Sequence, residues 1–178
     1  FLEIARITQS GKGTGQIIAT GAFTTEESPI PYGAHFAKVE VNELTGTVKV
    51  KAFHAYQDCG TPINPDLALG QMYGAILKSI GHTLYEKMIF DEHGKCLNPN
   101  FLDYKVPMIK DLPEDFRSEL VFVDEKLGPF GGKSISEIAT NGAAPAIATA
   151  IYDAIGVWVR EYPFTAEKVL EAIREQKK

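Results

Sequence analysis

The sequence predicts an α+β protein of two layers, in which a mixed β-sheet packs against helices. Two neighbouring segments alternate between apolar and polar residues, and a short polar turn separates them. A long segment with apolar residues at helical spacing follows, and short strand-like and helix-like segments then alternate to the end of the chain. The expected order is hairpin, helix, strand, helix and strand, with a C-terminal helix. Such an order favours a two-layer unit built on a mixed sheet.

The strands are predicted from period-2 alternation. A first strand is expected at residues 16–23, after the Gly-rich residues 11–15. The hairpin is expected at residues 37–42 and 48–53, because valines and alanines there alternate with charged residues. Asn42 to Gly46 supply its turn. Two short strands are expected later, at residues 120–123 and 157–160.

The long helix is predicted to begin near Asn64. Asn is a favourable N-cap, Pro65 suits the first helical position, and Asp66 suits the positive helix end. The apolar residues that recur at helical spacing are Leu67, Tyr73, Leu77, Ile80, Leu84 and Met88. Two further helices are expected at residues 144–155 and 165–176, and Thr165 caps the second.

Three glycines interrupt the long helix, at Gly70, Gly74 and Gly81. A glycine inside a helix costs about 1 kcal/mol relative to alanine. Their presence indicates that something packs closely on this helix. Another helix or strand would satisfy the pattern, and so would a cofactor.

The composition narrows the possible functions. Net charge is −5, and basic residues cluster only in the short C-terminal tail, so we expect no nucleic-acid partner. No apolar segment is long enough to predict a membrane span or a signal peptide. The two cysteines are far apart and suit a reducing cytoplasm. The chain begins with Phe1, which favours a processed subunit or a fragment.

Several candidate sites have a structural explanation. Residues 11–15 (Gly-Lys-Gly-Thr-Gly) lack the spacing of a phosphate-binding P-loop, so a turn is expected there. His54, Asp58 and Cys59 follow one strand and its exit, which is a poor arrangement for converging zinc ligands. His82 and His93 have no partner at ligand spacing. Structural roles are expected for all five of these side chains.

The segment from Gly131 to Glu137 is the most informative. Glycines allow backbone N–H groups to approach an anion or a cofactor closely, and the segment ends in a single carboxylate. The alternative is a helix capping box, because Ser134 and Glu137 are three residues apart. The residues alone leave both interpretations open.

Several motifs together resemble the molybdenum hydroxylases, the family of xanthine dehydrogenases and aldehyde oxidases. The resemblance covers approximately residues 33–170, and its order and spacing match the C-terminal region of the family's molybdopterin-binding subunit. The motifs are Asp58-Cys59-Gly60-Thr61-Pro62-Ile63-Asn64-Pro65, Gly70-Gln71-Met72-Tyr73-Gly74, Asp103-Tyr104 with Pro107, Asp111-Leu112-Pro113, Gly128-Pro129-Phe130-Gly131-Gly132-Lys133 with Glu137, the stretch from Pro145 to Ala154, and Lys168-Val169-Leu170.

The resemblance implies roles for named residues. Glu137 falls on the family's catalytic glutamate, and Gln71 falls on a residue that hydrogen-bonds the pterin. The segment whose backbone would wrap the cofactor and border the metal comprises Lys133, Ser134, Ile135 and Ser136, and no side chain is expected to ligate the metal. Residues 33–178 would form the cofactor-binding subdomain, and residues 1–32 would belong to the preceding part of the molybdenum domain.

The resemblance also implies the chemistry. Glu137 would act as general base while a molybdenum-bound oxygen attacks an N-heterocycle or an aldehyde, and hydride would pass to the metal centre. The cofactor would be molybdopterin, in its plain or cytosine dinucleotide form. [2Fe–2S] clusters and FAD would lie in partner subunits or domains. The remainder of the molybdenum subunit is an expected partner, and the isolated fragment is expected to be inactive.

One departure from the family pattern favours an alternative. The family's loop reads Gly-x-Gly-Glu, whereas Ser134 and Ser136 occupy both glycine positions here. A non-catalytic binding or assembly module that retains the fold would tolerate this change. The retained Glu137 and Gln71 favour the enzyme.

Overall fold

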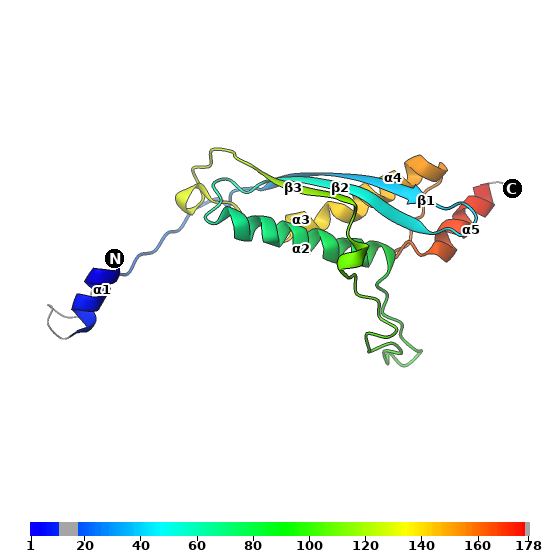
Figure 1. Cartoon of the computed structure of the whole chain (residues 1–178), viewed down its shortest axis with the longest axis horizontal. Helices are drawn as coiled ribbons and strands as arrows, with labels where there is room; N and C mark the ends of the chain where they lie inside the picture. The colour runs from blue at the N-terminus through cyan, green and yellow to red at the C-terminus, as the bar shows by residue number, and fades with distance from the viewer. Residues whose placement is uncertain (11–17, 177–178) are drawn as a thin grey trace.

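The computed structural model describes residues 1–10 and 18–176. Within them, three strands form one mixed sheet, and helices cover one of its faces (Figure 1). Strand β1 (Tyr32–Val41) pairs antiparallel with β2 (Val48–Asp58), and β2 pairs parallel with β3 (Asp115–Val121). The predicted α+β class with a mixed sheet is confirmed.

The predicted hairpin is present, and it is longer than expected. Its turn is held by Asn42, whose side-chain oxygen accepts hydrogen bonds from the N–H groups of Leu44 (3.0 Å) and Thr45 (3.1 Å). Gly46 closes the turn with a φ of 75°, in the left-handed region that favours glycine. Beyond the alternating residues, pairing continues to Tyr32 opposite Asp58. The hairpin therefore carries Asp58 to the far end of the sheet.

Helix α2 (Pro65–Leu84) begins as predicted, because the Asn64 side chain accepts a hydrogen bond from Leu67 N–H at 3.1 Å. Its buried face agrees only in part with the predicted apolar spacing. Ile80 and Leu84 are buried, whereas Leu67 is 72% exposed and Met88 lies beyond the helix end. Met72 and Ile76, which are completely buried, complete the core-facing stripe.

The remaining helices complete the layer against the sheet. They are α3 (Ile138–Asn141), α4 (Ala143–Ile155) and α5 (Ala166–Gln176), and two 3-10 turns, η1 (Ile109–Asp111) and η2 (Pro129–Gly131), lie between α2 and α3 in the chain. Thr165 caps α5 as predicted, accepting a hydrogen bond from Lys168 N–H at 3.4 Å. The most deeply buried apolar side chains come from the sheet and from α2, α4 and α5: Phe53, Met72, Ile76, Ile80, Ile147, Ile151 and Val169.

Two of the predicted strands are wrong. Residues 157–160 form no strand, and Trp158 instead stacks on Tyr152 with ring centroids 4.5 Å apart. Residues 18–23 are irregular, while residues 11–17, which include the Gly-rich segment, lie outside the described residues. The strand predicted at 120–123 exists but begins at Asp115. Each error has the same cause, because apolar residues near a turn resemble a strand until pairing partners are known.

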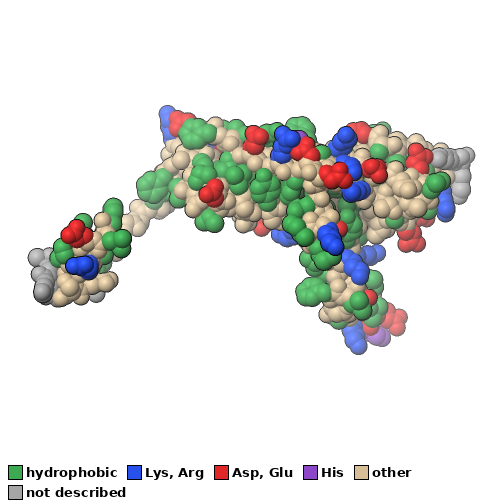
Figure 2. All heavy atoms as spheres, viewed as in Figure 1, with side chains coloured by type: hydrophobic (Ala, Val, Ile, Leu, Met, Phe, Trp, Pro, Cys, Tyr) green, Lys and Arg blue, Asp and Glu red, His purple; other side chains and the backbone are tan. Residues whose placement is uncertain are grey.

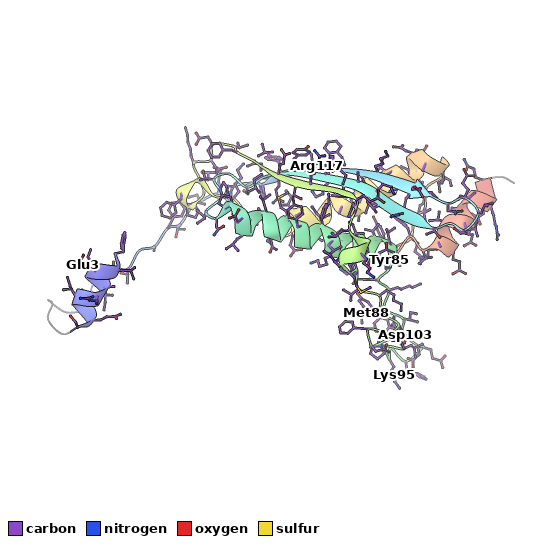
Figure 3. All side chains as sticks on the ribbon, viewed as in Figure 1. Glu3, Tyr85, Met88, Lys95, Asp103 and Arg117 are labelled. Atoms are coloured by element: carbon purple, nitrogen blue, oxygen red, sulfur yellow. The ribbon has the colours of Figure 1, made fainter. Side chains whose placement is uncertain are left out.

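Two segments extend away from the body of the molecule. Helix α1 (Leu2–Gln9) forms one of them (Figure 1). Residues 85–108 form the other, an arm with Tyr85 and Met88 near its base and Lys95 and Asp103 further out (Figure 3). Apolar side chains lie on the surface of both segments (Figure 2), and Phe101 on the arm is 85% exposed. In the described part of the chain, no helix has the length and apolar character to cross a membrane.

Candidate functional site

Two loops cross at the end of the sheet where β2 finishes. Thr61 N–H donates to the carbonyl of Gly131 at 2.7 Å, and Lys133 N–H donates to the carbonyl of Cys59 at 2.8 Å. Gly60 has a φ of 63°, and a Cβ there would lie 2.2 Å from the Gly131 oxygen. Glycine is therefore required at this crossing, which joins the exit of β2 to the Gly-rich loop.

The side chain of Lys133 forms an ion pair at this crossing. Its Nζ donates a hydrogen bond to Asp58 Oδ2 at 2.6 Å, and this bond raises the pKa of Lys133. Asp58 Oδ1 accepts a second hydrogen bond from Gly60 N–H at 2.8 Å. The Lys133 ammonium is thus paired within the chain, so only its stem and backbone remain for a ligand.

A cavity of about 370 Å³ lies between the crossing and the start of α2. Its lining includes predicted cofactor residues from α2 and from the Gly-rich loop: Gln71, Lys133, Ile135 and Ser136. Other residues complete its walls: Cys59, Thr61, Pro62, Ile63, Asn64, Leu67, Ala68 and Gly132. Burial raises the pKa of the Cys59 thiol, so the neutral thiol is favoured there.

A smaller cavity of about 190 Å³ lies further along α2 and contains the predicted base. Glu137 lines it together with Ser136, and α2 contributes Gln71 and two glycines. A Cβ added at Gly70 or Gly74 would meet no heavy atom within 4 Å. These two glycines therefore leave an open helix face beside Glu137 that no other part of the described chain fills.

The capping-box interpretation of Ser134 and Glu137 is wrong. Helix α3 begins only at Ile138, and the Glu137 side chain makes no cap hydrogen bond. Ser134 Oγ instead accepts a hydrogen bond from Ser136 N–H at 3.4 Å, which closes a local turn. Ser134 itself is exposed and lines neither cavity. The carboxylate of Glu137 is exposed and is not used to begin the helix.

The sequence reasoning missed two polar residues of the smaller cavity, Lys78 and Thr140. Lys78 follows Gln71 by seven residues on α2, and this spacing places both side chains on one helix face. The sequence alone could therefore have indicated Lys78 as a neighbour of Gln71 on α2. Thr140 gave no comparable signal, because it reaches the cavity through the short helix after Glu137.

The earlier metal-ligand candidates do not converge. His54 Nε2 lies 2.9 Å from Asp115 Oδ2, in a pair between neighbouring strands. Asp58 is paired with Lys133, and Cys59 lines the larger cavity. Among residues 1–10 and 18–176, no group of three or more His, Cys, Asp or Glu side chains is placed to hold a metal ion.

The chain matches a known family model and is similar in sequence to several named proteins. The model described as a molybdopterin cofactor-binding domain matches residues 1–113. The probable hypoxanthine oxidase XdhD of Escherichia coli K12 is 52% identical over 175 residues, which cover 98% of this chain and 18% of that protein. The aldehyde oxidoreductase molybdenum-binding subunit PaoC of the same strain is 32% identical over 160 residues, which cover 88% of this chain and 21% of that protein.

Solved structures agree with these sequence matches. Quinoline 2-oxidoreductase from Pseudomonas putida 86 superposes with a TM-score of 0.75 at 34% identity, over 80% of this chain and 18% of that one. The chain therefore spans about a fifth of the length of the relatives it matches. The expected resemblance is confirmed: the chain belongs to the molybdopterin cofactor-binding domain family of the molybdenum hydroxylases.

Proposed function

We propose that this chain is the C-terminal portion of a molybdopterin-dependent hydroxylase, in which Glu137 is the catalytic base. One observation carries the proposal: Gln71, Ser136 and Glu137 line one cavity beside the open helix face at Gly70 and Gly74. We further propose that residues 33–178 form the cofactor-binding subdomain and that residues 1–32 belong to the preceding part of the molybdenum domain. The extension of residues 1–10 away from the body supports that division (Figure 1).

The residues present fit a pterin cofactor. A pterin ring needs several hydrogen-bond donors and acceptors, and the two cavities offer the amide of Gln71, the hydroxyls of Thr61 and Ser136, and nearby backbone groups. The open faces of Gly70 and Gly74 allow a flat group to approach α2 closely. Gln71 and the backbone of Lys133 to Ser136 would hold the cofactor, in plain or dinucleotide form.

The chain's own contribution to the reaction would be a proton acceptor, the carboxylate of Glu137. When bound, the molybdenum cofactor supplies the two-electron oxidation. The carboxylate of Glu137 would accept the proton that the oxygen nucleophile gives up, which requires hydrogen-bond distance between the two oxygens. Because the Glu137 side chain is exposed and makes no cap hydrogen bond, it is free for this task.

The substrate class we favour is an N-heterocycle. The relative at 52% identity is named a probable hypoxanthine oxidase, whereas the relative named an aldehyde oxidoreductase subunit is 32% identical. The partners would be the remainder of the molybdenum subunit, together with iron–sulfur and flavin subunits or domains. A cytoplasmic location stays a prediction from the cysteine usage.

A non-catalytic binding or assembly module is the second candidate, and the turn formed by Ser134 and Ser136 favours it.

The experiment that separates the two candidates is to purify the complete enzyme, measure its molybdenum and pterin, and assay hypoxanthine and an aromatic aldehyde with a dye acceptor. Bound molybdenum with turnover of either probe supports the hydroxylase. Absence of turnover, whether molybdenum is bound or not, contradicts the hydroxylase and favours the module.

A further inference from the structure

The ion pair between Lys133 and Asp58 joins two parts of the chain that are 75 residues apart. Lys133 precedes the candidate base Glu137 by four residues. Asp58 ends β2 and directly precedes the loop that leads into α2 and Gln71. The pair therefore spans the two segments that build the cavities.

Both members of the pair are removed from solvent. The Lys133 side chain is 5% exposed and that of Asp58 is 8% exposed, and their charged atoms lie 2.6 Å apart. Glu125 Oε2 lies 3.6 Å from the same ammonium, and the ring of Tyr32 lies 5.7 Å from it. Glu125 is itself held by the N–H groups of Lys126 and Leu127.

Such a buried pair needs an explanation other than stability. Removing two charges from water costs free energy that their attraction only partly returns, so a buried ion pair is weak evidence for added stability. A buried pair does fix geometry, because breaking it leaves an uncompensated charge. The segment it restrains contains Gly128, Gly131 and Gly132, whose backbone freedom otherwise opposes a single loop conformation.

We propose that Lys133 and Asp58 are positioning residues, which hold the loop of residues 131–137 in one position relative to the start of α2. The inference rests on the proposed function, because it assigns the pair to the placement of Glu137 relative to Gln71. It adds a second role for Lys133, because the ammonium acts on the loop through Asp58 while the backbone remains for the cofactor.

The test uses the complete enzyme with three variants of the pair, Lys133→Met, Asp58→Asn and the double variant. Asparagine retains an oxygen that can accept the Gly60 N–H, so the D58N change removes mainly the charge. Lys133→Arg restores a cation. Lys168→Met is the matched control, because Lys168 forms a pair of similar length, 2.7 Å, with Glu161 outside both cavities. The readouts are kcat per bound molybdenum, with hypoxanthine as the probe, and amide hydrogen exchange.

We expect kcat per bound molybdenum to fall by roughly 10- to 100-fold in each single variant, because a small misplacement of a catalytic group is costly. The double variant should lose no more than the worse single variant. Amide exchange should accelerate by roughly 10- to 100-fold in residues 131–137. Arginine should restore part of both readouts, and Lys168→Met should change neither.

A purely structural role predicts a different pattern, in which molybdenum content and activity fall together. An unchanged kcat per bound molybdenum would therefore overturn the proposal, as would unchanged exchange in the loop. The exchange measurement needs no substrate. If the parent enzyme turns over no probe, the proposed function fails, while loop exchange still decides whether the pair positions the loop.

Discussion

Gln71 and Ser136 each line both cavities of the candidate site, although one lies on α2 and the other on the Gly-rich loop. The larger cavity extends from these two residues toward the start of α2. The smaller one contains Glu137. A ligand that contacts Gln71 and Ser136 is therefore adjacent to the candidate base.

Replacing Gln71 should weaken cofactor retention without weakening the fold. The side chain is exposed, so Gln71→Ala removes few contacts within the chain. Loss of its hydrogen bonds should lower the molybdenum and pterin content of the complete enzyme by roughly 5- to 10-fold. Metal analysis and pterin fluorescence measure this, and His82→Ala, an exposed position on the same helix, serves as the control. Full cofactor content in the Gln71 variant would exclude this residue from the binding site.

Alanine substitutions at the three α2 glycines should change the free energy of unfolding in opposite directions. Gly70→Ala and Gly74→Ala meet open space, so each should raise the free energy of unfolding of the chain by roughly 0.5–1 kcal/mol. Gly81→Ala should lower it, because the new Cβ would lie 2.6 Å from Pro107 Cδ. Denaturant unfolding of the three variants checks these signs.

In the complete enzyme, the same open face should be occupied. Gly74→Leu should therefore reduce molybdenum content and turnover, even though a Cβ at this position meets no heavy atom within 4 Å in the described chain. Normal cofactor content and turnover in this variant would show that nothing packs on α2 at Gly74.

The sequence could predict the elements whose signals are local. Asn64 and Pro65 mark the start of α2, and the alternation around Val39 and Val50 marks the hairpin, because capping and strand period depend only on near neighbours. Val157 to Arg160 show the opposite case. Their apolar residues suit a strand, but the packing of Trp158 on Tyr152 takes the place of strand pairing.

Contacts between residues far apart in the sequence could not be predicted from such local signals. The parallel pairing of β3 with β2 brings Asp115 beside Ala52, and no local pattern specifies it. The pairing of Lys133 with Asp58 likewise has no sequence signal. Glu137 could be proposed from family resemblance, whereas the cavity that it shares with Lys78 required the fold.

A surface network at the sheet should make stability depend on pH. Glu114 accepts hydrogen bonds from Lys51 at 2.6 Å and Lys49 at 3.0 Å, and these bonds lower its pKa from 4.5 to about 2. Because the folded pKa is the lower one, the stabilisation is present above about pH 4.5 and is lost as the pH falls toward 2. The network is exposed, so the effect should be small.

Thermal unfolding of Glu114→Gln measures this dependence. Its Tm should lie slightly below that of the parent chain at pH 7, and the two values should converge as the pH falls toward 2. Glu171→Gln, an exposed carboxylate on α5, is the control. A Tm difference that stays constant over this range would show that the ion pairs do not contribute.

The chain alone should retain little cofactor. Gln71 and Glu137 are both exposed here, so the described residues supply only part of an enclosing site. Metal analysis of the purified chain should find far less than one molybdenum per molecule, with the complete enzyme as the positive control. A stoichiometric amount in the chain would contradict the dependence on the remainder of the subunit.

The most direct test of the catalytic assignment is Glu137→Gln in the complete enzyme, with kcat measured per bound molybdenum. Glutamine preserves the shape of the side chain but cannot accept the proton, so kcat should fall by roughly 10²- to 10⁴-fold while cofactor content stays near normal. Turnover at the parent rate, with the cofactor in place, would remove Glu137 from the mechanism.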